Sequence, residues 1–382
     1  MASRSARRRS TASIYRAAIP SICGASWWAS WVGRFPKRCS PEEMVMKAVP
    51  DFRAPDRTWI IAEIGVNHEG DERVAADLID RAAECGVDAV KFQTFTLGHY
   101  ISTVQPERRQ RTGRFELSRA QFARLAERAR DRGLVFFSTP FHMADADFLD
   151  GIAPVFKVSS GDLTYLDLIK HIAGKGKPTI ISTGLGTQDE VARAVEAFLS
   201  VRPKARGDGS LLLMHCVAAY PTPAEEANLR NIGWLKREFG LPVGWSDHTL
   251  DIKACELAVA AGAVALEKHF TYRKENQAFH DHALSADPAD MAALVKAVRA
   301  AETYLGRDRR ERAPSEEKLL AHMRRSIGAA ADIPAGTPVK REWLTWLRPA
   351  WGLQADEMPK VVGRKLKRAV AAGDLIKAED LA

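Results

Sequence analysis

Short apolar runs alternate with stretches of helical periodicity from Trp59 to about residue 304. The first run is Trp59–Gly65, and residues 74–85 then keep apolar side chains on one helical face until Gly86. The following segments repeat this order of an apolar run and a helical pattern. Uninterrupted apolar runs of this length predict strands that are buried on both faces, as in parallel sheets.

Eight of these runs are predicted to be strands. They are Trp59–Gly65, Ala89–Thr94, Val135–Phe141, Val155–Ser160, Thr179–Leu185, Leu211–Val217, Val243–Thr249 and Val264–Thr271. Helices are expected between most of them, for example over Ser118–Arg132 and Asp189–Leu199. Eight strand–helix units in succession favour an α/β fold of the (β/α)8 TIM-barrel type. An open doubly wound sheet is the alternative.

The pattern divides the chain into four parts, of which residues 46–306 hold the predicted barrel. Residues 307–320 are densely charged, contain Pro314 and are interpreted as a linker. Residues 321–382 carry short apolar pieces between Gly and Pro residues and are predicted to form a small second domain. A segment of this size is small for an independent core, so we expect this domain to pack against a larger folded unit.

Residues 1–45 differ in character from the rest of the chain. They hold eight Lys and Arg against two Glu, which gives +6 of the net charge of +8. No apolar core follows Arg7–Arg9 that could serve as a secretory signal. Our interpretation is a start codon assigned too far upstream, with Met44 or Met46 as the true start. A disordered basic arm is the alternative.

The composition narrows the class of protein. No run of 18 apolar residues predicts a membrane span, and the nearly neutral remainder of the chain gives no basic patch for nucleic acid. The cysteines are scattered and odd in number, which does not fit a disulfide framework. They are Cys23, Cys39, Cys85, Cys216 and Cys255. We therefore expect a cytoplasmic protein without a membrane or nucleic-acid partner.

Two histidines, His248 and His269, follow two successive predicted strands. The carboxyl ends of the strands form the rim where barrel active sites lie, and two imidazoles there can share a divalent metal. A lone histidine is more often structural, but each member of this pair stands close to a carboxylate, Asp247 or Glu267. The pattern favours a metal site, and with oxygen ligands beside a phosphate substrate it would suit Mn²⁺ or Mg²⁺.

Two lysines, Lys91 and Lys157, alternate with apolar residues at the ends of two other predicted strands. A lysine that points into a barrel needs an anionic partner, because an unpaired buried charge is costly. Several hydroxyls end neighbouring strands, among them Thr139, Ser182 and Ser246. This set suits a phosphorylated, carboxylated substrate. For any single position, a structural capping or pairing role is the alternative.

The motifs taken together resemble the sialic acid synthase family. The strings are IAEIGVNHEGD, VKFQTF, STPF, FKVSSGD, STG, MHC followed by YPTP, GWSDHT and LEKHFT, in this order. The resemblance covers residues 59–382, and the part from about residue 321 resembles that family's C-terminal antifreeze-like (SAF) domain. It implies that phosphoenolpyruvate condenses with the open-chain aldehyde of an N-acylated hexosamine, which yields a nonulosonic acid and phosphate.

The resemblance also implies roles for single residues. Phosphoenolpyruvate would bind against Lys91, Gln93, Thr139, Lys157, Ser160, Ser182, Tyr220 and Ser246. His248 and His269 would hold a divalent metal, with Mn²⁺ expected and Mg²⁺ or Co²⁺ as alternatives. Glu63 matches the carboxylate near the sugar and the attacking water, Asp162 stands where the family commonly has Glu, and Asp281 matches a loop aspartate.

Three departures from the family pattern stand out. Val217 and Ala218 occupy positions that often hold Thr and then Asn or Ser. Residues 277–282 read QAFHDH in place of an Arg/Asn-Pro-Gly-Pro-Asp loop, and residues 348–352 read RPAWG in place of RPGNG. The last two changes fall where the sugar is expected to bind, so they bear on the identity of the sugar more than on the reaction.

The resemblance further implies a domain-swapped homodimer, in which each tail covers the partner's barrel. Arg348 would reach the acyl-amino group of the sugar in the other protomer, and a turn cap before Pro349 is its alternative role. The sugar is expected to be similar to N-acetylmannosamine. The alternatives are a legionaminic or pseudaminic acid precursor or a 6-phosphosugar, a metal-dependent aldolase, and a non-catalytic carbohydrate-binding protein.

Overall fold

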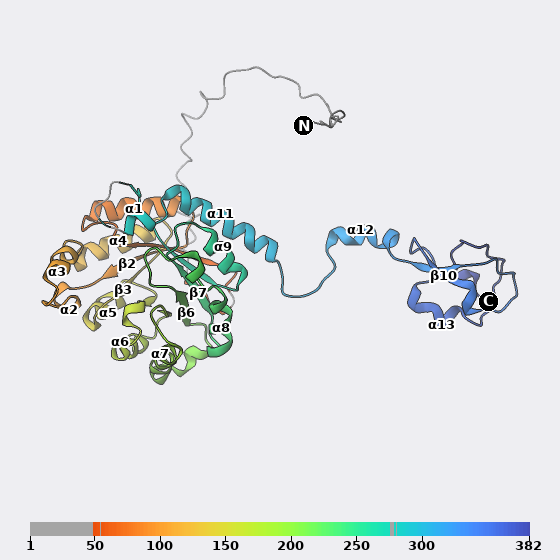
Figure 1. Cartoon of the computed structure of the whole chain (residues 1–382), viewed down its shortest axis with the longest axis horizontal. Helices are drawn as coiled ribbons and strands as arrows, with labels where there is room; N and C mark the ends of the chain where they lie inside the picture. Colours follow the sequence, from red (N-terminus) through yellow and green to blue (C-terminus); the bar gives the residue numbers. More distant parts are fainter. Residues whose placement is uncertain (1–48, 54, 276–278, 280) are drawn as a thin grey trace, which may run out of the picture. The chain divides into compact units, whose positions relative to one another are not determined.

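The computed structural model describes residues 49–382, apart from residues 54, 276–278 and 280. The interpretation of residues 1–45 and part of the 277–282 loop therefore lie outside the described residues. The chain forms two compact units, and the boundary between them falls between Ala301 and Glu302. Figure 1 shows the first unit as strands ringed by helices.

Eight parallel strands build the first unit. They are β1 (Trp59–Gly65), β2 (Ala89–Thr94), β3 (Val135–Pro140), β4 (Phe156–Val158), β5 (Thr179–Ser182), β6 (Leu211–Cys216), β7 (Val243–Asp247) and β8 (Ala265–His269). Their order in the sheet is β3-β2-β1-β8-β7-β6-β5-β4, and the two end strands β3 and β4 also lie in contact. The sheet is thus a nearly closed barrel, which confirms the (β/α)8 prediction over an open doubly wound sheet.

Helices follow the strands, and the longer ones that cover the barrel each bury one face, whereas α2 and α3 have no buried residues. They are α1 (Glu72–Glu84), α2 (Leu97–Tyr100), α3 (Pro106–Gly113), α4 (Arg119–Asp131), α5 (Met143–Asp150), α6 (Leu166–Gly174), α7 (Gln188–Val201), α8 (Arg230–Phe239), α9 (Lys253–Ala260), α10 (Asp281–Leu284) and α11 (Pro288–Leu305). Helix α4 begins with a capping box in which Ser118 and Gln121 satisfy each other's backbone N–H groups. Its buried face carries Phe122, Leu125 and Ala129.

The second unit has a small core of its own. It contains α12 (Pro314–Met323), α13 (Met358–Val361) and an antiparallel pair, β9 (Ser326–Ala329) with β10 (Leu344–Leu347). Helix α12 begins inside the segment that was interpreted as a linker. The buried apolar residues gather from the whole unit, among them Ile327, Val361 and Ile376. No helix in the described part of the chain is long and apolar enough to cross a membrane.

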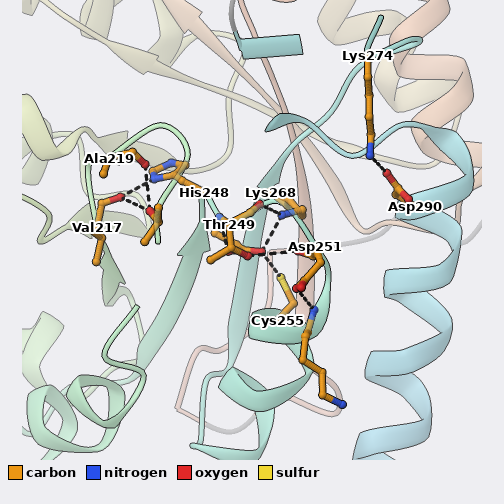
Figure 2. Close-up of polar contacts among 12 residues, drawn as sticks. Val217, Ala219, His248, Thr249, Asp251, Cys255, Lys268, Lys274 and Asp290 are labelled. Atoms are coloured by element: carbon orange, nitrogen blue, oxygen red, sulfur yellow. Dashed lines mark hydrogen bonds and ion pairs between the residues drawn. The ribbon is translucent and has the colours of Figure 1, made fainter. Parts of the chain in front are cut away.

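The outer side of β7 and β8 carries a buried ion pair. Lys268 Nζ lies 2.8 Å from Asp247 Oδ2. It also donates to the Thr249 carbonyl at 2.8 Å (Figure 2). The Cys255 thiol of α9 donates to the same carboxylate oxygen at 3.3 Å. Successive strand residues point to opposite faces, so this pair faces the helices while Ser246 and Glu267 face the barrel interior. Asp247 and Lys268 thus stabilise the scaffold.

This pair gives a prediction about stability. Lys268→Met should lower the free energy of unfolding by about 3 kcal/mol, because it leaves the Asp247 carboxylate buried without its counter-charge. Chemical denaturation of the full chain, followed through the buried Trp245, measures the loss. Lys253→Met is the matched control, since Lys253 pairs with Glu256 on the exposed face of α9. Equal stability losses in the two variants would contradict the scaffold role.

Candidate active site

A cavity of about 470 Å³ opens among the residues at and just beyond the ends of the strands. Its lining includes twelve of the predicted site residues, which are Glu63, Lys91, Gln93, Thr139, Lys157, Ser160, Asp162, Ser182, Tyr220, Ser246, His248 and His269. Asp281 is buried in α10 and is not among the described lining residues, and Arg348 follows β10 in the second unit. The fold thus brings twelve of these side chains together, while the role of each stays a prediction.

Glu267 is the centre of the polar floor of this cavity. Lys157 Nζ lies 3.2 Å from both carboxylate oxygens of Glu267, and Ser246 Oγ donates to Oε1 at 3.0 Å. Lys91 Nζ lies 3.7 Å from the same Oε1 atom. One carboxylate from β8 therefore holds lysines from β2 and β4 and a hydroxyl from β7.

Lys91 joins this centre to a second carboxylate, Glu63 of β1. The Lys91 Nζ atom lies 2.9 Å from Glu63 Oε2 and donates to Thr139 Oγ1 at 3.3 Å. Gln93 Nε2 donates to Glu63 Oε1 at 3.4 Å. The contacts join four buried charged side chains into one group, which we name the charge cluster. Its members are Glu63, Lys91, Glu267 and Lys157.

The charge cluster pushes the pKa values of its two carboxyl groups apart. Burial alone would raise the pKa of Glu267, but Lys157 and Lys91 outweigh burial and lower the pKa below its ordinary value. Burial raises the pKa of Glu63, and Lys91 only partly opposes it. Titratable groups whose pKa values are pushed apart are typical of acid–base sites, and here Glu267 is the more acidic group and Glu63 the stronger proton acceptor.

Sequence reasoning left Glu267 out of the predicted site, although it stands two residues before His269. The alternation along β8 carries the signal, because residues 267 and 269 share the interior face while Lys268 faces outward. Arg108 and Tyr100 were also missed as lining residues. Arg108 and Tyr100 come from the short helices after β2, which carry no strand-end pattern.

The two histidines lie side by side at the rim, with ring centroids 5.5 Å apart. His248 Nδ1 lies 2.8 Å from the Val217 carbonyl oxygen (Figure 2), so its N–H donates there and the lone pair of Nε2 stays available. His269 Nδ1 is buried without a hydrogen-bond partner in the described structure. Burial lowers the pKa of both histidines, most strongly that of His269, so both imidazoles are neutral near pH 7.

Neutral imidazoles with available lone pairs fit a divalent metal. Among the described residues, however, no group of three or more His, Cys, Asp and Glu side chains could hold one. The fit therefore extends to two protein ligands, and the remaining ligands would come from water or substrate.

The loop after β6 supports this rim even where it departs from the family pattern. Val217 lacks a polar side chain, yet its backbone carbonyl accepts the bonds from His248 and from Thr222 Oγ1. Tyr220 lies against His248 with tilted rings whose centroids are 4.2 Å apart, and it meets the His269 ring edge-on at 6.0 Å. The backbone thus supplies a contact that the side-chain pattern of the loop does not show.

Comparison with known proteins gives matches along both units. The NeuB family matches residues 78–310, and the SAF domain matches residues 324–382. The N,N'-diacetyllegionaminic acid synthase of Legionella pneumophila is 37% identical, over 82% of this chain and 92% of that protein. The pseudaminic acid synthase of Campylobacter jejuni is 31% identical, over 87% of this chain and 99% of that protein.

A solved structure extends the similarity to three dimensions. The N-acetylneuraminic acid (sialic acid) synthetase of Leptospira borgpetersenii, determined in complex with citrate, is 32% identical with a TM-score of 0.65. The match covers 69% of this chain and 90% of that one. These matches confirm the resemblance that the motifs indicated. The chain belongs to the NeuB family, the sialic acid synthases with a C-terminal SAF domain, and it is an enzyme similar to the synthases of nonulosonic acids.

Proposed function

We propose that this enzyme condenses phosphoenolpyruvate with the open-chain form of an N-acylated hexosamine to give a nonulosonic acid and inorganic phosphate. The observation that carries the proposal is the charge cluster beside two neutral histidines. The cluster offers two lysines to an anion, and the histidines offer nitrogen lone pairs to a metal. A non-catalytic carbohydrate-binding protein has no need for both features in one cavity.

Phosphoenolpyruvate would bind through the lysines and the groups around them. Lys91 and Lys157 would meet its carboxylate and phosphate, because an ammonium group pairs with either anion. The directed hydrogen bonds would come from Gln93, Thr139, Ser160, Ser182, Tyr220 and Ser246. Glu267 contacts both lysines, so we assign it the role of a positioning residue for phosphoenolpyruvate.

The sugar would bind at the rim. His248 and His269 would hold a divalent ion, Mn²⁺ in our proposal, which supplies Lewis-acid polarisation of the sugar aldehyde. C3 of phosphoenolpyruvate forms the new bond to the aldehyde carbon, water adds to C2, and the C2–O bond to phosphate breaks. Glu63 is suited to orient that water and accept its proton, because burial raises the pKa of this carboxyl group.

The sugar is proposed by class. Relatives of this chain are named for legionaminic, pseudaminic and N-acetylneuraminic acids, all products of amino sugars. The candidates are therefore an N-acetylmannosamine-like sugar, a diacylated precursor of the legionaminic or pseudaminic type, and a 6-phosphosugar. Asp162, whose pKa is raised by burial, lines the same cavity and would face this substrate together with Asp281.

We also propose a domain-swapped homodimer in which Arg348 reaches the sugar in the partner's barrel. The proposal rests on the family resemblance and on the position of Arg348 in a unit separate from the cavity. Arg348 immediately follows β10 (Leu344–Leu347), so a small folded unit would present it.

The reaction and its metal are tested together. The enzyme with Mn²⁺ should release phosphate from phosphoenolpyruvate only when an accepted N-acylated hexosamine is present, and a chelator should abolish the release. His269→Ala should lower kcat/KM at least a hundredfold, the order expected for lost Lewis-acid assistance. Undiminished activity of the metal-stripped His269→Ala enzyme would overturn the metal assignment. Pyruvate as the accepted co-substrate, without phosphate release, would indicate an aldolase.

Glu267 gives a second prediction. Glu267→Gln keeps the shape but removes the charge, so Lys157 and Lys91 lose the carboxylate that orients them. We expect the KM for phosphoenolpyruvate to change by about tenfold or more, while the KM for the sugar changes little. Glu256→Gln, which removes a carboxylate from the exposed face of α9 outside the cavity, serves as the comparison and should leave both KM values unchanged. An unchanged KM for phosphoenolpyruvate in Glu267→Gln would contradict the positioning role.

Mixing two inactive variants tests the shared site. His269→Ala and Arg348→Ala homodimers should each be inactive or severely impaired. In a mixed dimer, the barrel of the Arg348→Ala chain keeps its own His269 and receives Arg348 from the other chain, so activity should reappear. Light scattering and differently tagged chains establish that mixed dimers form. Mixed dimers without activity would place Arg348 within its own chain or outside the site.

A further inference from the structure

Arg108 differs from the other cations in the lining of the cavity. Lys91 and Lys157 both pair with carboxylates of the charge cluster. The Arg108 guanidinium donates to the Gln105 side-chain carbonyl at 3.2 Å, and no ion pair to a carboxylate is recorded for it in the described structure. Arg108 is exposed on α3, so its charge lies at the solvent side of a cavity whose floor is buried.

The balance of charges in the lining explains why the charge of Arg108 is important for substrate binding. The cations Lys91, Arg108 and Lys157 are matched by as many carboxylates, those of Glu63, Asp162 and Glu267. A phosphate monoester brings nearly two negative charges at neutral pH. At the floor this group has to compete with Glu63 and Glu267 for the lysines. At Arg108 it meets a cation without that competition.

The position of α3 places Arg108 in the lining of the cavity. Helix α3 is tied to α2 by Arg109, which donates to the backbone carbonyls of Leu97 and Ile101. Tyr100, at the end of α2, also lines the cavity. Burial raises the pKa of Tyr100 and the positive charge of Arg108 counteracts this, so the guanidinium acts on a group inside the cavity. Asp162, the third carboxylate of the lining, accepts a hydrogen bond from Ser159 Oγ at 2.5 Å.

We propose that Arg108 binds the phosphate group of a substrate at the mouth of the cavity. The planar guanidinium can donate two parallel hydrogen bonds to phosphate oxygens, which a lysine cannot do. This inference rests on the proposed condensation reaction. The phosphate has two sources, phosphoenolpyruvate and a phosphorylated amino sugar, and the same residue recognises the chemistry that they share.

Steady-state kinetics of Arg108→Ala separate the two sources. The KM for the substrate that carries the recognised phosphate should rise on the order of tenfold, with kcat little changed. A rise for phosphoenolpyruvate with every sugar indicates the first source. A rise confined to a 6-phosphorylated hexosamine, with no change for the unphosphorylated sugar, indicates the second. The effect should shrink at high ionic strength, because the group is exposed.

Two further variants control for charge and geometry. Arg111→Ala removes the same charge from the same helix, but Arg111 is not among the described lining residues, so its kinetics should match those of the unmodified enzyme. Arg108→Lys should fall between Arg108→Ala and the unmodified enzyme. Unchanged KM values for all phosphorylated substrates in Arg108→Ala would overturn the inference, as would a loss that Arg111→Ala reproduces.

Direct binding separates failure of this inference from failure of the proposed reaction. Calorimetric titration of the full chain with phosphoenolpyruvate and with a 6-phosphohexosamine requires no turnover. If the unmodified enzyme releases no phosphate with any amino sugar, the proposed reaction fails. Arg108 is then judged by whether Arg108→Ala weakens binding of either ligand about tenfold, and equal affinities would overturn its role.

Discussion

Four buried charges constrain the interior of this barrel. Ionised groups removed from water are several kcal/mol less stable unless they are paired and hydrogen-bonded. Glu267 must therefore remain within reach of Lys157 and Lys91, and Lys91 within reach of Glu63. These contacts connect β1, β2, β4 and β8, which fixes the relative positions of strands from different parts of the barrel. The same lysines are thereby held where an anionic substrate can meet them.

The residues of the buried ion pair and the residues that line the cavity lie on opposite faces of strands β7 and β8. On β7 and β8, the outward residues Asp247 and Lys268 form a buried ion pair behind the site. The inward residues Ser246, Glu267 and His269 line the cavity. Because adjacent residues of a strand point in opposite directions, a short segment can serve both purposes. The outward ion pair of β7 and β8 thus lies directly beside the inward residues in sequence.

The sequence predicts most of this arrangement because strand ends in a barrel converge on one rim. The eight strands follow from the apolar runs. The twelve cavity residues are predicted partly from the strand ends, as for Lys91 and His269, and partly from the family resemblance, as for Gln93 and Tyr220. The role of Glu267 does not follow, because it depends on the register that sets Ser246 beside Glu267 and on Lys157 reaching across from β4. Arg108 escapes the same reasoning, since it sits on a helix within a connection rather than at a strand end.

The helix α12 shows a second limit of sequence patterns. Residues 307–320 are charged enough to be interpreted as a linker, yet Pro314 is the first residue of a helix that continues to Met323. Proline is compatible with the first turn of a helix because the N–H that it lacks would be unsatisfied there. The backbone carbonyl of Val217 is a similar case at the rim, since it holds His248 whatever side chain the position carries.

The central claim is that this cavity joins phosphoenolpyruvate to a sugar with cleavage of the C2–O bond. Phosphoenolpyruvate that carries ¹⁸O in the oxygen between C2 and phosphorus tests it most directly. Mass spectrometry of the products should find the label in inorganic phosphate, with an unlabelled nonulosonic acid whose C2 oxygen derives from water. Label retained in the organic product, or a condensation that releases no phosphate, would contradict the account.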